Sequence, residues 1–551
     1  MTSKDLLFVP LGGTGEIGMN LNLYGYNDRW IMIDLGISFA DDHLPGIEVI
    51  MPDPAFIVER RDKLQALFVT HAHEDHAGAV AHLWPQLRCP VYATPFTIAI
   101  LRAKLKEAGL LDQVPLHEVP LGGQVTVGDF TVDYVSLTHS IPEPNALLIT
   151  TPVGKIFHTG DWKLDPGPVI GEPTDELALR AIGQSGILAM ICDSTNVFNK
   201  QGSGSETEVR DSLVDVVAGH KGRVIVTTFA SNVARLDSIA AAAAANGRHI
   251  CLLGRSLVRN VEIARSLGYL QDMPPVVAEE DAGYLPKDKV LYISTGCQGE
   301  PRAALSRIVA GQHRHVSISP GDVVVFSSKI IPGNDISIGR MINQLVKAGA
   351  EVITEKDAFI HVSGHPGQGD LEQMYDWIKP QVAVPVHGEA RHLLKHAAFA
   401  REWGVPQVIT AENGSVVRLA PGPAKIIEVV DTGRLALDGK VLVAADGLEI
   451  AERRRIMHHG YVGVAVAVDE NGELVADPCV DLQGVPAKDA DDLIDDILDA
   501  VEDAIERMSK ADRRKDDRMS EALRVVVRRV ARDATGKQPG PITKVHLLRV
   551  D

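Results

Sequence analysis

The residues with the clearest chemistry lie between Thr70 and His76, directly after the apolar run 67–69. Holding several imidazoles and a carboxylate together without a counter-charge means desolvating them or making them share protons, and both are unfavourable. A divalent metal ion removes this difficulty. The candidate ligands in this stretch are His71, His73, Asp75 and His76.

The spacing of these residues suggests how they divide between metal ions. His71 and His73 are two residues apart, so in an extended or loop conformation both side chains point the same way and can bind one ion. Asp75 and His76 are then available to a second ion. Two zinc ions about 3.5–4 Å apart are a common arrangement for hydrolysing a phosphodiester or an amide. The alternative, a polar loop with scattered histidines, does not account for this density of ligands.

Two further candidates lie where predicted strands end. His139 follows a predicted strand over 130–135, and Asp161 follows another that includes residues 155–158. Loops at strand ends are where a sandwich of two sheets displays a site, so both residues could complete the metal centre. Either one alone could equally be structural.

The segment Gly13 to Gly18 spells the glycine pattern of a dinucleotide-binding turn, and Asp34 lies roughly where a ribose-binding acid would be expected. That site needs a helix after the last glycine, but residues 20–24 alternate polar and apolar before a turn and a second strand at 30–33. This pattern predicts a hairpin, which offers no helix N-terminus to a pyrophosphate. Asp34 is better placed to orient the metal loop by contacting a ligand and not the metal itself.

Apolar strands alternate with helical stretches between about residues 205 and 356, which predicts a parallel sheet covered on both faces. A more mixed pattern precedes and follows this block, so it is predicted to be inserted into another domain.

Beyond the inserted block, three runs are predicted to be strands, at 456–468, 474–482 and 542–550. They are accompanied by an amphipathic helix from about Leu493 to Met508 and a basic helix over 513–532. The apolar face of the first helix could be core or could be covered by a partner. The predicted segments are 1–204 and 357–432 for a split first domain, 205–356 for the insert, 433–452 for a linker and 453–551 for a small α+β domain.

Composition sets broad limits. The 551 residues carry a formal charge of −18, which argues against non-specific adhesion to nucleic acid or anionic membranes but does not exclude a local groove. The five cysteines form no C-x-x-C pair, as expected in a reducing cytoplasm. No signal peptide and no membrane span are expected.

The series His71-x-His73-x-Asp75-His76, then His139, then Asp161 resembles the metallo-β-lactamase superfamily. The resemblance implies one zinc ion held by His71, His73 and His139, a second held by Asp75 and His76, and Asp161 bridging both. The large inserted α/β block resembles that of the β-CASP nucleases within this superfamily.

Three further motifs extend the resemblance: Asp193 after a strand, the loop His361 to His365, and His387 after an apolar strand. With segments 228–232, 295–301 and 331–334 and the C-terminal region, essentially the whole chain resembles bacterial ribonuclease J, except that Cys297 stands where a serine is expected. The implied fold is α/β: a metallo-β-lactamase αββα sandwich with an inserted doubly wound β-CASP domain and a small α+β C-terminal domain.

The resemblance also implies residue roles. His387 would complete the second zinc site, Asp75 would serve in catalysis as well as in metal binding, and His365, held by Asp193, would act as the general acid. A pocket for a 5′-terminal monophosphate is implied, although its small residues could instead be simple turn-formers. His392 and His396 are expected on a helix face and not in a third metal site. The expected substrate-binding residues are Ser231, Asn232, His361, Val362, Ser363, Gly364 and His365.

The expected function is that of a zinc-dependent ribonuclease with 5′→3′ exonuclease and endonuclease activity in RNA maturation and decay, acting by attack of a metal-activated hydroxide on the phosphodiester. Two Zn²⁺ per subunit are expected, with Mn²⁺ or Mg²⁺ as alternatives in activity. The expected partners are RNA, preferably 5′-monophosphorylated, further copies in a homodimer or homotetramer, and RNA-decay proteins, but no membrane. The competing hypotheses are a hydrolase of a small ester, thioester or lactam, and a non-catalytic RNA-decay scaffold.

Overall fold

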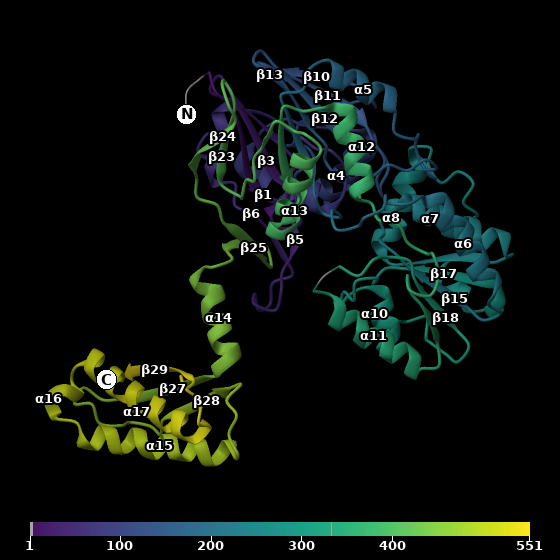
Figure 1. The fold of residues 1–551 in the computed structure, drawn as a ribbon. Coiled ribbons are helices and arrows are strands. Elements are labelled where there is room, and N and C mark those ends of the chain that lie inside the picture. Colours follow the sequence, from purple (N-terminus) through teal and green to yellow (C-terminus); the bar gives the residue numbers. More distant parts are fainter. Residues whose placement is uncertain (1–3, 332, 551) are drawn as a thin grey trace. The chain divides into compact units, whose positions relative to one another are not determined.

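The computed structural model describes residues 4–331 and 333–550 (Figure 1). The chain forms two compact units. One contains the residues up to Phe39 together with Ile50–Gly433, and the other contains Ala40–Val49 and the residues from Arg434 onward. Among the described residues no helix is long and apolar enough to cross a membrane.

The larger unit is built around two facing sheets whose inner side chains form one core. Phe68 from the first sheet and Ile149 and Ile191 from the second are among the buried residues of this core. The first sheet contains, in spatial order, β24 (Lys425–Val429), β23 (Ser415–Ala420), β1 (Leu6–Gly12), β3 (Leu21–Tyr26), β4 (Arg29–Ile33), β7 (Leu64–Phe68), β8 (Val91–Ala93) and β9 (Leu116–Glu118). The second contains β10 (Gln124–Val127), β11 (Phe130–Ser136), β12 (Asn145–Thr151), β13 (Gly154–His158), β14 (Ala189–Asp193), β20 (Val382–Val386) and β22 (Gln407–Val408).

Helices cover the outer face of the second sheet. α5 (Glu176–Gln184), α12 (Gln368–Ile378) and α13 (Ala390–Glu402) contribute buried residues to a cluster with Phe157 and Met190. The predicted helix near 77–84 is two helices, α2 (Glu74–Ala77) and α3 (Val80–Leu87). The αββα sandwich expected from the motifs is therefore the observed fold.

Strands β3 and β4 form the hairpin that the alternating pattern predicts. They pair antiparallel, with Asn22 opposite Ile33. Asn27 and Asp28 form the turn with φ of 52° and 60°, the left-handed conformation that a two-residue hairpin turn requires. No helix follows the glycines at 13–18, so the dinucleotide reading of this segment is excluded by the chain path.

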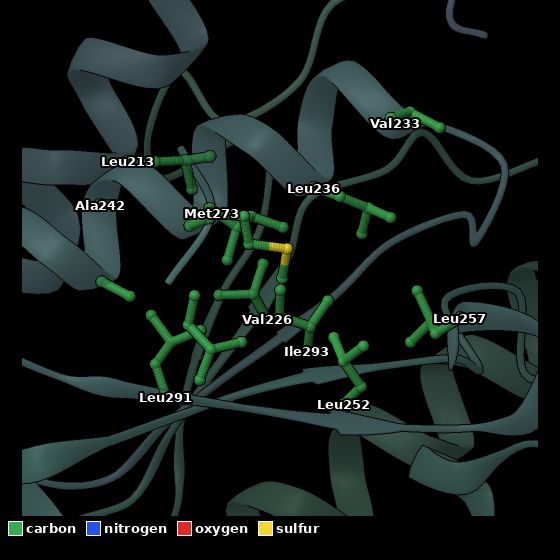
Figure 2. Close-up of a cluster of buried hydrophobic side chains, with 14 of the residues drawn as sticks. Leu213, Val226, Val233, Leu236, Ala242, Leu252, Leu257, Met273, Leu291 and Ile293 are labelled. Atoms are coloured by element: carbon green, nitrogen blue, oxygen red, sulfur yellow. The ribbon is translucent and has the colours of Figure 1, made fainter. Parts of the chain in front are cut away.

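The inserted region contains a five-stranded parallel sheet in the order β16-β17-β15-β18-β19. Helices cover both of its faces, and one of the resulting cores is shown in Figure 2, where Val226, Leu252 and Ile293 lie beneath the helical residues. The predicted doubly wound insert is thus confirmed. Its strands are β15 (Val224–Thr227), β16 (His249–Leu253), β17 (Val290–Ser294), β18 (Val323–Phe326) and β19 (Glu351–Ile353), and its main helices are α6 (Glu206–Ala218), α7 (Val233–Ala245), α8 (Arg255–Ser266), α10 (Ala304–Val309) and α11 (Asp335–Lys347).

The insertion leaves the sandwich continuous. Strand β14, which precedes the insert, pairs in parallel with β20, which follows it, and Asp193 lies opposite Val386. The insert also shares a hydrophobic core with the sandwich, because Ala72 and Phe96 belong to the same buried cluster as β15 and α7. The metal loop and the insert are therefore packed together through apolar contacts.

The smaller unit contains a three-stranded sheet of β28 (Cys479–Gln483), β27 (Tyr461–Val468) and β29 (Ile542–Arg549), packed against α15 (Ala490–Arg507) and α17 (Asp516–Thr535). Every fourth residue or so of α15 is buried in this core, so its apolar face is mainly core. The strand predicted over 456–468 is wrong at its start, because α14 (Leu448–His459) ends at His459 and the strand begins at Tyr461. The segment 433–452, expected to be a linker, contains the hairpin of β25 (Arg434–Asp438) and β26 (Val441–Ala444) and the start of α14.

Candidate metal centre

All seven predicted metal ligands converge in the folded chain. The ligand atoms of His71, His73, His139 and Asp161 lie within 4.8 Å of one another. Asp75, His76, Asp161 and His387 form a second such group, so Asp161 belongs to both. The two groups together have the composition and overlap expected of a two-metal site with one shared carboxylate.

The spacing of the donor atoms fits a bound cation. His73 Nδ1 lies 3.1 Å from His71 Nε2 and 3.0 Å from His139 Nε2. A tetrahedral zinc ion with metal–nitrogen distances of about 2.0–2.1 Å holds its ligand atoms about 3.3 Å apart. His387 Nε2 is also buried without a hydrogen-bond partner among the described residues, as a nitrogen reserved for a metal would be.

Strand ends position these ligands. His71 and His73 follow β7, Asp75 and His76 begin the short helix α2, and Asp161 follows β13. His387 follows β20 in the left-handed conformation, with φ of 52°. A buried non-glycine residue in this conformation is strained, and such strain is typical of functional positions that the surrounding fold holds in place.

The ring nitrogens of His76 and His139 that face away from the centre form hydrogen bonds to neighbouring groups. His76 Nδ1 donates to Asp34 Oδ2 at 2.7 Å, and His139 Nδ1 donates to the carbonyl of Gly364 at 2.5 Å. These bonds set the tautomer that leaves each Nε2 lone pair directed at the centre. Asp34 therefore orients the metal loop, as the sequence predicts.

The electrostatics of the first ligand group favour neutral imidazoles. Burial lowers the pKa of His73 to about 4 and also lowers the pKa of His71 and His139. In the second group burial would lower the pKa of His76 and His387, but the neighbouring carboxylates, Asp161 foremost, outweigh burial and raise both. Burial alone would raise the pKa of Asp161, but His387, His76 and His365 together lower it. Neutral nitrogen donors and an anionic oxygen donor are the ligand types that zinc takes in proteins.

Asn20, which the sequence does not single out, contacts the second ligand group. Its Nδ2 donates to the carbonyl of Asp75 at 3.0 Å and lies 3.1 Å from His76 Nε2 and 3.2 Å from His387 Nδ1. Asn20 is 3% exposed, so its amide is committed to the second ligand group. Its partners are 55 to 367 residues away in the chain, and no local pattern marks it.

The glycine-rich segment after β1 has a structural role at the same centre. The carbonyl of Gly13 accepts a hydrogen bond from the backbone N–H of His387 at 2.7 Å. The short strand β2 (Thr14–Gly15) pairs in parallel with β21 (Gly388–Glu389) immediately afterwards. The segment thus anchors the last metal ligand to the first strand of the chain.

His365 and Asp193 lie beside the metal ligands. His365 Nδ1 donates to Asp193 Oδ2 at 2.8 Å and lies 3.8 Å from Asp161 Oδ2. Burial alone would lower the pKa of His365, but Asp193 and Asp161 raise it to about 9. The side chain remains 24% exposed, so a protonated imidazole faces both the centre and the solvent.

The predicted phosphate-binding residues come from two segments, which a third residue links. Asn232 caps α7 by accepting from the backbone N–H of Arg235, and Ser231 precedes it. Arg235 donates to the carbonyl of Ile360 at 3.0 Å and lies 3.5 Å from His361 Nδ1. The structure therefore connects the start of α7 to the 361–365 loop through Arg235.

Within that loop the predicted residues differ in environment. Val362 is buried in the core, so only its backbone is available to a substrate. Ser363 Oγ accepts from the backbone N–H of His365 at 3.0 Å. A side chain at Gly364 would lie 2.7 Å from the ring of His139, so the loop can approach the metal centre only with glycine there.

Arg235 is a second residue that the sequence did not reveal. It is completely buried and forms two hydrogen bonds to Glu206, of 3.0 and 2.7 Å. It also donates to both the carbonyl and the hydroxyl of Ser327. The residue thus ties the start of the insert, at α6, to the segment that leaves it.

His392 and His396 do not form a metal site with any described residue. His396 Nδ1 is 2.8 Å from Ser194 Oγ, and its Nε2 is 3.0 Å from the hydroxyl of Tyr375. Both ring nitrogens of His396 are therefore occupied by neutral partners. His392 Nδ1 has no hydrogen-bond partner among the described residues and lies 3.7 Å from Glu389, and both histidines lie on α13, as predicted.

Comparison with known families covers most of the chain. A beta-lactamase superfamily domain matches residues 29–180, and a Zn-dependent metallo-hydrolase RNA specificity domain matches 349–409. The ribonuclease J beta-CASP domain matches 221–345, and the ribonuclease J C-terminal domain matches 448–546. A ribonuclease J from Sinorhizobium meliloti is 47% identical over 88% of this chain and 87% of its own length. The chain belongs to the ribonuclease J family.

Other relatives agree with this assignment. A ribonuclease J from Mycolicibacterium smegmatis is 41% identical over 86% of this chain and 85% of its own length. A solved structure of a protein of unknown function from Enterococcus faecalis shares the fold, with a TM-score of 0.50 and 18% identity over 75% of this chain and 99% of that chain. As a member of the ribonuclease J family, this protein is a metal-dependent ribonuclease with RNA as its substrate, and a small-molecule hydrolase is not favoured.

Proposed function

We propose that this ribonuclease binds two zinc ions per subunit and degrades RNA both exonucleolytically, in the 5′→3′ direction, and internally. The observation that carries the proposal is the pair of ligand groups that share Asp161, with the His365–Asp193 pair beside them. Bound zinc would lower the pKa of a water molecule and neutralise charge on the phosphodiester, and Mn²⁺ or Mg²⁺ could substitute in activity.

The residues around the ligands supply the proton chemistry. His365 carries a proton near neutral pH, because Asp193 and Asp161 hold its pKa at about 9. It can therefore protonate the oxygen that leaves phosphorus, as a general acid. Asp193 fixes the ring through Nδ1, so Nε2 is the nitrogen that gives up the proton. Asp75 lies 3.6 Å from His76 Nε2 and completes the acidic side of the centre.

We assign the 5′-monophosphate pocket to Ser231, Asn232, His361, Ser363 and Gly364, with the backbone of Val362 and the ring of His365 at its edge. Burial, Arg235, Lys329 and Lys163 lower the pKa of His361 well below its usual value, in that order of effect. A neutral His361 with Nδ1 directed at Arg235 presents Nε2–H as a donor. Small residues in the same loop allow backbone N–H groups to approach a phosphate.

We propose that residues 1–204 and 357–432 form the catalytic domain, 205–356 the inserted domain and 453–551 the C-terminal domain. We further propose that the protein functions in RNA maturation and decay in the cytoplasm as a homodimer or homotetramer, with other RNA-decay proteins as partners.

The proposal is tested by digesting an end-labelled RNA that carries either one or three 5′ phosphates, with and without a chelator. The monophosphorylated RNA is expected to be shortened from its 5′ end, the triphosphorylated RNA to be cut mainly internally, and both activities to stop with chelator. Equal exonucleolytic rates on the two RNAs would contradict the 5′-phosphate pocket, and activity that survives chelation would contradict the metal mechanism.

Replacing Ser363 with leucine separates the two modes of cleavage. The larger side chain should obstruct the phosphate pocket while leaving the metal ligands in place, so exonucleolysis should fall more than cleavage of a circular RNA, which has no 5′ end. Equal losses on the linear and circular substrates would place Ser363 outside a 5′-phosphate pocket. Thermal unfolding of the variant controls for loss of fold.

A further inference from the structure

A cavity of about 810 Å³ opens in the inserted domain, and none of the proposed metal ligands or 5′-phosphate-binding residues lines it. It lies at the carboxyl ends of β15, β16 and β17, where Thr228, Gly254 and Thr295 line it. Glu107, at the end of α4 (Pro95–Glu107) in the sandwich, forms part of its wall. The carboxyl edge of a doubly wound parallel sheet is where such folds most often bind ligands.

The lining of the cavity is rich in arginine. Arg259 donates to Glu107 at 3.1 Å, yet its Nε is buried without a hydrogen-bond partner among the described residues. Arg255 is exposed, and the described part of the chain offers its side chain no hydrogen bond or ion pair. The charged groups that line the cavity are Arg255, Arg259, Arg302, Arg307 and His313, with Glu107, Glu279 and Glu300 opposing them.

The start of α8 adds to the attraction for an anion. This helix is 12 residues long and begins at Arg255 with no side-chain cap and no acidic residue in its first turn. A cation at this position is unfavourable beside the positive end of the helix dipole unless an anion lies between them. Gly254, with φ of 130°, is the N-cap, and a side chain there would lie 2.7 Å from Thr295 Oγ1.

An aromatic side chain completes the lining. Phe229 is half-buried and lines the cavity between Thr228 and Ala230. The next residues along the chain are Ser231 and Asn232, which we have assigned to the 5′-phosphate pocket. Arginine side chains beside an aromatic ring are the usual means of binding single-stranded nucleic acid, through phosphate and base respectively. The volume is within the roughly 300–1,000 Å³ that ligand sites occupy.

We propose that this cavity binds a phosphorylated nucleotide, held as part of the RNA substrate at a distance from the bond that is cut. Arg255 and the first turn of α8 bind its phosphate, and Phe229 contacts its base. The proposal rests on the proposed function, because the same RNA has to occupy both this cavity and the metal centre. A free mononucleotide has the same chemistry and is the other source to be tested.

The test compares 5′-monophosphorylated RNAs of three and fifteen nucleotides as substrates of the wild-type protein, Arg255→Glu and Arg255→Lys. Arg255→Glu should raise KM for the longer RNA about tenfold without changing kcat, and the trinucleotide should show no such increase. Arg255→Lys should restore most of the loss. Arg314→Ala, an exposed arginine of the same domain that does not line the cavity, is the matched control and should leave both RNAs unaffected.

Salt dependence gives a second readout that does not depend on cleavage. The dissociation constant of the fifteen-nucleotide RNA, measured with the inactive His76→Ala protein, should depend less on salt when Arg255→Glu is added. Loss of one phosphate contact to a single strand lowers the slope of log K against log salt by about 0.7. An unchanged slope, or an equal rise of KM for both RNA lengths, would overturn the proposal.

Added nucleoside monophosphate separates the two sources. If it alters hydrolysis of the trinucleotide by the wild-type protein but not by Arg255→Glu, the cavity binds a free nucleotide and the assignment to RNA is overturned. If it has no such effect while the length and salt effects hold, the cavity is a subsite for RNA. Failure of the wild-type protein to cleave either RNA would instead count against the proposed function, and the salt slope would still decide the role of the cavity.

Discussion

Two buried polar clusters lie at the two ends of the loop 361–365, and they differ in how their polar atoms are satisfied. At the end near His365, His73 Nδ1 lies 3.0–3.1 Å from nitrogen atoms of both His71 and His139, and a single proton on it can serve only one of these contacts. At the end near His361, Arg235 is neutralised by Glu206 and donates to protein carbonyls. The first cluster is complete only with a cation, whereas the second is completed by the protein itself.

This difference separates a site built for a ligand from a cluster that maintains the fold. Burial alone does not distinguish them, since Arg235 and His71 are both completely buried. What distinguishes them is whether the described structure provides each buried donor and acceptor with a partner. The loop between the clusters is therefore held at the His361 end by contacts within the protein, and at the His365 end it lies beside the candidate metal ligands.

The largest effect should come from breaking the ligand cluster. His76→Ala removes one ligand of the second group, and loss of metal stabilisation worth several kcal/mol should reduce RNA hydrolysis on the order of 10³-fold or more. Thermal unfolding should change little, since the sandwich core is untouched. His546→Ala, an exposed histidine in the smaller unit, is the control and should keep full activity. Full activity in His76→Ala would contradict a catalytic metal centre.

Breaking the cluster around Arg235 should lower the free energy of unfolding. Arg235→Ala leaves the buried Glu206 without its charge partner, and such changes cost about 3–5 kcal/mol. Chemical denaturation should show this loss for the single variant. The double variant Arg235→Met with Glu206→Leu removes both charges and should recover most of it. A single variant as stable as the wild-type protein would show that the pair does not hold the insert in place.

A smaller effect, on metal affinity, is expected from weakening the hydrogen bond between Asp34 and His76. Asp34→Asn weakens the hydrogen bond that orients His76, and loss of such a bond typically lowers metal affinity 10–100-fold. Titration against a chelator of known affinity measures this change. Asp62→Asn is a suitable control, because the Asp62 side chain is 99% exposed. Equal affinities in the two variants would mean that Asp34 does not support the ligand.

The residues that could be predicted from sequence are those whose evidence is local. His71 to His76 are recognisable because four candidate ligands occur within six residues. The parallel sheet is recognisable because β15 and β17 are apolar except for their last residues, Thr227 and Ser294. The return of the mixed pattern after the insert predicts that the first domain is split, although it does not predict that β14 pairs with β20.

Other features depend on contacts that a single sequence does not display. Arg235 meets Ser327 and Ile360, which are 92 and 125 residues away, and a buried arginine on a helix has the same one-letter pattern as an exposed one. The contacts of Asn20 are likewise with residues 55 to 367 positions away. The end of α14 reads as the start of a strand because this helix lacks the apolar face that marks a helix, and Ile450 is its one buried residue.

The most direct test of the account is the metal content of the purified protein, measured together with RNA hydrolysis, for the wild-type chain and His387→Ala. His387 lies more than two hundred residues beyond Asp161, and their side-chain atoms meet at 3.0 Å. We predict two metal ions per wild-type subunit, and the loss of one ion and of hydrolysis in a His387→Ala protein that remains folded. A variant that keeps both ions and cleaves RNA at the wild-type rate would contradict this prediction.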